Sequence, residues 1–328
     1  MSGQITREVV GASAMASAGI RPPLIDSNGT VRPTMAENSE LAFDIVDVFA
    51  ERAYDGNPLA VVYGADGLNT AQLRAIAHEI QLAETAFPVA IDRDRYEIRI
   101  FTPEAEVPFA GHPTLGTAWA LHRRGLLRTG EVVQRCGTGD VEVFVSHDGA
   151  ELTVAPRQVT GAVDVGPMLG GLGLTDADLV RPARLASCGL AFVYVAVTPD
   201  CVRGASPLGP SWVAPQGERS DPLGGVCVYT AEAFDDGVEV YARVFCPEAG
   251  ITEDPGTGSA AAGLGLVLLA DRMAAAEGKT RYRIRQGHES GRRSVLHGWV
   301  EARAGKAFQV RVGGGVVPVA SGHLTPPT

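Results

Sequence analysis

A repeated segment is the feature of this sequence that most constrains its fold. Arg-Ile-Phe-Thr-Pro-Glu-Ala at residues 99–105 recurs as Arg-Val-Phe-Cys-Pro-Glu-Ala at residues 243–249, with five of seven positions identical and an offset of 144 residues. In both copies a strand-like segment precedes the match, and a glycine-containing turn and an alanine-rich helix follow it. Solenoid repeats recur every roughly 20–50 residues, so this offset is too long for one. The repeat therefore predicts two similar lobes related by pseudo-symmetry.

The remaining pattern predicts many short strands and three longer helices. We expect helices over 70–79, 114–124 and 259–272, with Thr70 as the N-cap of the first and Gly125 as the C-cap glycine of the second. Strand-like alternation fills most of the chain between them. The fold class predicted is α+β, with each lobe a curved mixed sheet or barrel around a central helix.

The first 40 residues differ from the rest of the chain. They carry little hydrophobic periodicity and no continuous apolar segment of the kind that forms the centre of a signal peptide. Their Gly, Ser, Ala and Pro content predicts a disordered extension over residues 1–40, the alternative being a targeting or partner-binding tail. We hypothesise that Met35 is the natural start, or that residues 1–34 are dispensable.

Charge and cysteine content exclude several classes of protein. The 28 basic and 38 acidic residues give a formal charge of −10 without a Lys/Arg cluster, which disfavours nucleic-acid binding. No apolar run reaches the ~18 residues that a membrane span needs. The five cysteines are an odd number and include no CxxC pair, which disfavours a structural metal site or a disulfide framework. A cytoplasmic protein is therefore expected.

Two glycine-containing junctions follow the two copies of the repeat, at residues 109–114 and 253–259. Each leads into a predicted helix, whose first N–H groups lack intrahelical partners and carry partial positive charge. If the lobes are pseudo-symmetric, these junctions face each other across the cleft between them. Two helix starts around one cleft predict a site for a small anion such as a carboxylate.

Two other interpretations of the second junction are weaker. Gly256-Thr-Gly-Ser-Ala-Ala261 matches GxGxxA, but ten residues separate the preceding strand from its first glycine, unlike a dinucleotide-binding strand. Two-lobed amino-acid racemases place one cysteine at each junction. Here the equivalent positions are Ala110 and Pro255, which disfavours a two-thiol reaction.

Several segments together resemble the PhzF-like (phenazine biosynthesis) isomerase family. They cover almost everything after residue 41 in the family's order: Gly56-Asn-Pro-Leu-Ala-Val-Val62, Ala83-Glu-Thr-Ala-Phe87, Ile100-Phe-Thr-Pro103, Phe109-Ala-Gly-His-Pro113, Glu253-Asp-Pro-Gly-Thr-Gly-Ser-Ala260 and Gln286-Gly287. The resemblance implies the two-lobed diaminopimelate-epimerase fold, a homodimer, and no organic cofactor or metal. It also implies a first lobe over 41–156 that regains residues 318–328, and a second lobe over 157–317.

The family resemblance also implies a reaction. The best-characterised member isomerises trans-2,3-dihydro-3-hydroxyanthranilate in phenazine antibiotic biosynthesis, a secondary-metabolite pathway, by moving one proton between ring carbons. By resemblance, Glu84 is the acid/base, Gly111 and His112 contact substrate, and Asp254, Gly258 and Ser259 match the Asp-x-x-x-Gly-Ser set. Thr257 lies within that set. The implied catalytic residues are thus Glu84, His112 and Asp254, and the implied substrate-binding residues are Gly111, Thr257, Gly258 and Ser259.

Physical chemistry also predicts the ionisation or the role of each polar residue independently of the family resemblance. A carboxylate that leads into a buried strand is desolvated, which raises the pKa of Glu84. The helix dipole disfavours a charged His112. For Asp254 three roles stay open: it accepts a proton, it orients a substrate amine, or its charge only complements the dipole of the following helix. Ser259 is also explained as the N-cap of that helix.

The sequence departs from the family around the pocket. Pro88 follows Phe87, Pro255 and Gly256 replace small residues after the aspartate, and residues 188–194 are more apolar than in the phenazine enzyme. These departures leave the substrate open more than the reaction. Two alternatives also stay open: an amino-acid epimerase with Glu84 and Asp254 as its two bases, and a catalytically silent ligand-binding protein.

Overall fold

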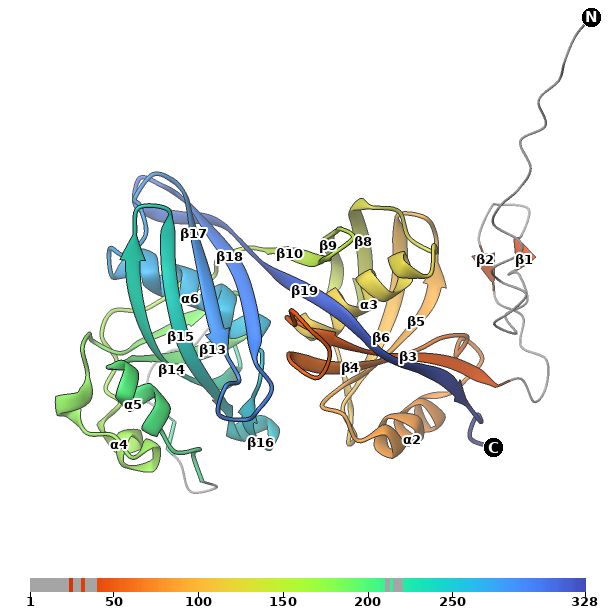
Figure 1. The fold of residues 1–328 in the computed structure, drawn as a ribbon, viewed down its shortest axis with the longest axis horizontal. Coiled ribbons are helices and arrows are strands. Elements are labelled where there is room, and N and C mark those ends of the chain that lie inside the picture. Colours follow the sequence, from red (N-terminus) through yellow and green to blue (C-terminus); the bar gives the residue numbers. More distant parts are fainter. Residues whose placement is uncertain (1–23, 26–30, 33–39, 210–212, 215–220) are drawn as a thin grey trace, which may run out of the picture.

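A computed structural model describes residues 24–25, 31–32, 40–209, 213–214 and 221–328 of the chain (Figure 1). In the first lobe, strands pair in a ring that closes on its starting strand. In ring order these strands are β3 (Leu41–Val48), β4 (Asn57–Val62), β5 (Thr85–Ile91), β6 (Arg95–Phe101), β8 (Gly130–Cys136), β9 (Gly139–Val145), β10 (Gly149–Val154) and β19 (Lys306–Leu324). The first lobe is therefore a barrel.

The second lobe repeats this arrangement with other strands. Its order is β11 (Gln158–Val159), β12 (Arg184–Ser187), β13 (Ala191–Ala196), β14 (Leu223–Phe234), β15 (Gly237–Cys246), β17 (Gly278–Gln286), β18 (Ser294–Arg303) and β19. β19 pairs with β10, which leads directly into β11, so this ring also closes. Two short strands, β7 (Glu106–Val107) and β16 (Ile251–Asp254), pair with β6 and β15 at equivalent places.

The pairing directions match between lobes. β4–β5 and β6–β8 are parallel in the first lobe, and β13–β14 and β15–β17 are parallel in the second, while the other ring pairings are antiparallel. A helix enters each barrel between equivalent strands: α3 (Gly111–Arg123) follows β7, and α6 (Gly258–Ala270) follows β16. The α+β fold with two pseudo-symmetric lobes, each a barrel around a central helix, is confirmed.

Small residues allow both central helices to be buried. α6 has no polar face, and nine of its residues are buried. A Cβ on Gly263 would lie 2.2 Å from the hydroxyl of Tyr194, which instead donates to the carbonyl of Ala260 at 2.8 Å. Large side chains from the barrel wall therefore pack directly on the helix backbone. In the first lobe Trp119 of α3 anchors the helix by donating to the carbonyl of His147 at 3.0 Å.

Three shorter helices lie outside the barrels. α2 (Thr70–Ile80) covers the first, and α4 (Gly166–Leu169) and α5 (Pro199–Gly204) flank the second (Figure 1). Turns of 3₁₀ helix occupy Gly170–Leu172, Asp176–Asp178 and Pro247–Ala249. Among the described residues, no helix is long and apolar enough to cross a membrane.

The helix boundaries correct three details of the sequence analysis. Asn69, not Thr70, is the N-cap of α2, because its side chain accepts from the N–H groups of Ala71 and Gln72. α3 begins at Gly111, three residues before the predicted start. α6 spans Gly258–Ala270, so Ser259 lies inside the first turn and is not the N-cap. Both central helices thus begin at a glycine of the predicted junctions.

The lobes are connected by shared strands. β19 pairs with β18 up to Gly313 and with β3 from Val316 onward, and Figure 1 shows it running from one lobe into the other. The domain limits at residues 156 and 317 stay a prediction. β10 of the predicted first lobe pairs with residues 310–315 of β19, which these limits assign to the second lobe. Most of residues 1–40 lie outside the described residues, as does Met35. Within that segment, β1 (Leu24–Ile25) pairs with β2 (Val31–Arg32).

Candidate active site

The starts of the two central helices meet at the boundary between the lobes. A Cβ built on Gly111 would lie 3.8 Å from Cα of Gly258 and 3.9 Å from the backbone nitrogen of Ser259. Neither helix has a side-chain cap: Ala110 has none to offer, and the side chain of Thr257 is used elsewhere. Two helix N-termini without side-chain caps therefore adjoin at this boundary, and their first N–H groups, which lack intrahelical partners, carry partial positive charge.

Glu84 lies beside this meeting point, in the loop between α2 and β5. Its side chain is 16% exposed, and burial raises the pKa of its carboxyl group from 4.5 to about 7. Within the described part of the chain, Oε2 of Glu84 has no hydrogen-bond partner, and Nε2 of His112 lies 3.5 Å away. A buried carboxyl group with a near-neutral pKa and a free oxygen can both accept and return a proton.

His112 lies in the first turn of α3 as a neutral ring. Burial lowers its pKa to about 4, against the opposing effect of nearby Asp254. One ring nitrogen hydrogen-bonds the backbone of Pro58, and Nε2 is without a partner among the described residues, so Nδ1–H is the donor to Pro58. Nε2 then presents a lone pair toward Glu84. Burial thus favours the neutral ring that was predicted from the position of His112 at a helix start.

Asp254 ends β16 in the second lobe, with both carboxylate oxygens bonded. Nδ2 of Asn57 donates to Oδ1 at 2.8 Å, and the hydroxyl of Thr257 donates to Oδ2 at 2.5 Å. Gln286 donates to that hydroxyl at 2.9 Å and to the Asp254 carbonyl at 2.7 Å, which directs the Thr257 proton to the carboxylate. Burial raises the pKa of Asp254, and the Thr257 bond and His112 oppose the rise.

The structure thus brings the seven predicted site residues to one place. Glu84, His112 and Asp254 act on one another electrostatically, Gly111 and Gly258 adjoin, and Thr257 and Ser259 stand at the start of α6. The catalytic and binding roles of these residues stay predictions. Among the described residues, no cluster of three His, Cys, Asp or Glu side chains is arranged to hold a metal ion.

Three further residues at the site were not identified as such from the sequence. Asn57 and Gln286 are buried polar side chains within motifs quoted for the family resemblance. Asn57 is the one polar residue of the apolar strand β4, which is a signal that could have found it, whereas Gln286 ends the charged strand β17 and carries no such signal. Cys246 belongs to the repeat and lies within electrostatic range of Asp254 and Glu84. Burial keeps its thiol neutral by raising its pKa.

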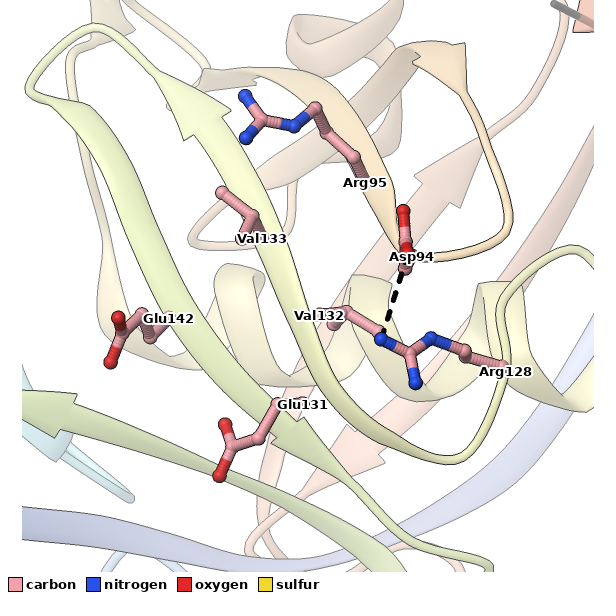
Figure 2. A pocket seen from close by; sticks show the side chains of 7 residues that line it. All are labelled: Asp94, Arg95, Arg128, Glu131, Val132, Val133 and Glu142. Atoms are coloured by element: carbon pink, nitrogen blue, oxygen red, sulfur yellow. Dashed lines mark ion pairs between the residues drawn. The ribbon is translucent and has the colours of Figure 1, made fainter.

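A separate surface hollow of about 380 Å³ lies on the first barrel (Figure 2). Its lining includes Arg128, paired with Asp94 at 3.6 Å, and Arg95, which pairs with Asp140 at 3.2 Å. These ion pairs are about half exposed, so they are well solvated and weak. The hollow contains neither a buried unpartnered group nor a helix start, and the interlobe site is the better candidate.

Comparison with known proteins decides the family. The sequence profile described as phenazine biosynthesis-like protein matches residues 46–322. The chain belongs to the phenazine biosynthesis-like protein family. This PhzF-type assignment confirms the resemblance found in the motifs and agrees with the two-barrel architecture.

Several relatives of this chain are named as isomerases. The chain is 35% identical to an uncharacterised isomerase of Mesorhizobium japonicum, over 85% of this chain and 97% of that protein. It is 32% identical to trans-2,3-dihydro-3-hydroxyanthranilate isomerase of Pseudomonas chlororaphis, over 85% and 98% of the two chains. The prediction of an isomerase is confirmed at this level.

A solved structure supports the fold independently. The phenazine biosynthesis protein of the PhzF family from Bacillus anthracis superposes with a TM-score of 0.76 at 23% identity, covering 87% of this chain and 99% of that one. At this identity the likeness shows the shared fold alone.

Proposed function

We propose that this PhzF-type protein moves a proton and a double bond within a small unsaturated amino acid, with Glu84 as the single acid/base. The observation that carries the proposal is the free Oε2 of Glu84, buried 3.5 Å from the unpartnered Nε2 of a neutral histidine. The substrate class follows the relative from Pseudomonas chlororaphis, whose name specifies trans-2,3-dihydro-3-hydroxyanthranilate. A role in secondary-metabolite biosynthesis, including that of antibiotics, is part of the proposal and is suggested by the family description, phenazine biosynthesis-like protein.

The geometry supports the following sequence of steps. The substrate carboxylate binds the free N–H groups at the starts of α3 and α6. Ionised Glu84 removes a proton from a substrate carbon, and the electron pair of the broken C–H bond forms a new C=C bond. The electrons of the original double bond move to its far carbon, which receives the same proton back from Glu84. Atoms and charge balance without another reactant, because the carboxyl group ends as it began.

Asp254 serves in this proposal to orient the substrate. Donors already occupy both of its oxygens and favour its charged form, while its remaining lone pairs can accept from a substrate amine. This supports one-base isomerisation over the epimerase alternative, in which Asp254 would be the second base. A homodimeric, cytoplasmic protein is part of the proposal, and the five free thiols agree with a reducing compartment.

The test uses trans-2,3-dihydro-3-hydroxyanthranilate and the variant Glu84→Gln. Removing a general acid/base lowers kcat by about 10²–10⁴-fold. We expect this loss for Glu84→Gln and no loss for Glu79→Gln, which changes an exposed glutamate of the nearby α2. In the wild-type protein kcat/KM should rise with pH through about 7, where Glu84 ionises. Near-normal turnover by Glu84→Gln would contradict the acid/base assignment.

Product analysis in D₂O separates the alternatives. Isomerisation moves the double bond and leaves deuterium at the carbon that receives the proton. Exchange at a stereocentre without bond migration would instead support the epimerase. Binding of the compound with neither exchange nor turnover would support the silent ligand-binding protein.

A further inference from the structure

The two halves of the candidate site belong to different lobes. Glu84 and His112 come from the first barrel, and Asp254 comes from the second. The shared strands β10 and β19 connect the barrels but do not contain any of these residues. The spacing between proton-transfer group and orienting carboxylate therefore depends on contacts made across the lobe boundary near the site.

The segment Gly56-Asn57-Pro58 contacts residues from both halves of the site, namely Asp254 of the second lobe and His112 of the first. Asn57 donates across the boundary to Asp254 and, at 3.0 Å, to the carbonyl of Gly256. The backbone of the next residue, Pro58, holds the ring of His112. Gly56 adopts φ +72°, and a Cβ there would lie 2.4 Å from the carbonyl oxygen of Val48, so the chain can turn this sharply only with glycine. The position of this tripeptide fixes the partners of two functional side chains at once.

Arg292, in the turn between β17 and β18, holds that tripeptide from the second lobe. Its Nε donates to the carbonyl of Gly56 at 3.1 Å, and its Nη2 pairs with Oδ1 of Asp47. Asp47 is a β3 residue only 2% exposed, and its other oxygen accepts from the backbone of Tyr54 at 2.6 Å. The Arg292 side chain is itself 27% exposed, so the pair is half-buried, and removing the arginine leaves the buried Asp47 carboxylate without its charged partner.

Backbone hydrogen bonds beside Arg292 tie the same two segments. Gly56 N–H donates to the carbonyl of Arg293 at 2.8 Å, and Val295 N–H donates to the carbonyl of Phe49 at 2.8 Å. The start and the end of the first-lobe loop are thus both bonded to the β17–β18 region, with the Arg292–Asp47 pair between them.

We propose that Arg292 is a positioning residue that holds the two halves of the site in register through Gly56, Asn57 and Pro58. The proposal rests on the proposed function for the identity of the halves. A second ion pair across the same boundary, Arg283 with Glu51 at 3.5 Å, provides a matched control, because its side chains are 40% and 70% exposed and touch none of these groups.

The experiment measures the ionisation of the Glu84 carboxyl group directly and needs no substrate. Its carboxyl stretch is assigned by pH-difference infrared spectroscopy of the full chain as the band that Glu84→Gln lacks. In the wild-type protein this band should titrate at about pH 7. We expect Arg292→Met to lower the midpoint by at least one pH unit toward 4.5, because loss of register admits water to Glu84, and Arg283→Met to leave it unchanged.

Turnover of trans-2,3-dihydro-3-hydroxyanthranilate gives a second measurement. Arg292→Met should lower kcat at least tenfold with a smaller change in KM. Arg292→Lys should restore part of the lost kcat, and kcat of Arg283→Met should stay within twofold of wild type.

An unchanged Glu84 midpoint in folded Arg292→Met overturns the proposal, even if stability falls. If Arg292→Met does not fold, Arg292→Lys and Asp47→Asn are measured instead, and unchanged midpoints in both overturn it. Failure of the acid/base assignment is separate, since it shows as turnover by Glu84→Gln.

Discussion

The Glu84 carboxyl group is buried, and among the described residues no donor bonds its Oε2 atom. These two features determine its acid/base behaviour. Removing water disfavours the charged form, so the pKa rises to about 7 and the group can gain and lose a proton near neutral pH. Burial also raises the pKa of Asp254, but unlike Glu84 this carboxyl group accepts hydrogen bonds from Asn57 and Thr257, and the Thr257 bond opposes the rise. Two carboxyl groups in one site are in this way suited to two different tasks.

The pKa of Glu84 predicts a pH-dependent stability. Its folded-state value of about 7 lies above the unfolded value of 4.5, so its contribution is fully present below pH 4.5 and is lost as pH rises through about 7. Glu84→Gln removes this loss. We expect the variant to gain about 2–3 kcal/mol of unfolding free energy relative to wild type between pH 4.5 and pH 8.5. Urea denaturation at both pH values measures this, with Glu79→Gln as the control.

At the scale of elements, the first residue of each copy of the repeat, Arg99 or Arg243, has the same structural role: it bonds a glutamate of the neighbouring short strand. Arg99 of β6 forms two bonds to Glu106 of β7, at 2.7 and 2.6 Å, and Arg243 of β15 forms two bonds to Glu253 of β16, at 3.1 and 2.7 Å. Each pair fastens the short strand that leads toward a central helix. In the second lobe the fastened residue is the direct neighbour of Asp254.

Burial distinguishes these two equivalent pairs. The side chains of Arg243 and Glu253 are 7% and 10% exposed, against 29% and 37% for Arg99 and Glu106. Breaking a buried pair typically costs about 3–5 kcal/mol, and an exposed one about 1 kcal/mol or less. We therefore expect Arg243→Met to lower the free energy of unfolding by several times more than Arg99→Met. Equal losses in urea denaturation would contradict this reading of the repeat.

At the scale of the whole molecule, two barrels share the strands β10 and β19 and enclose one site between them. A family resemblance adds a homodimer to this picture. Sedimentation velocity of the full chain at micromolar concentration should therefore show a species of about twice 34.3 kDa. A single species at the monomer mass would refute the prediction.

The sequence by itself predicted the duplication, the α+β class and the family, which are confirmed, and it named seven candidate site residues whose roles stay predictions. These follow from local signals: a repeated heptapeptide, glycines at helix starts, and motif residues in a fixed order. Helix starts were less accurate, because Thr114 and Ser259 resemble N-caps locally, whereas Gly111 and Gly258 begin the helices once these lie inside a barrel.

Only the tertiary structure decided which polar atoms share the site. Asn57 meets Asp254 across 197 positions of sequence, and Arg292 meets Asp47 across 245. No periodicity or spacing encodes such contacts, because they arise when two closed barrels pack and desolvate the groups between them. Burial also shifted the pKa values of Glu84 and His112, since a pKa depends on the water that the whole fold excludes.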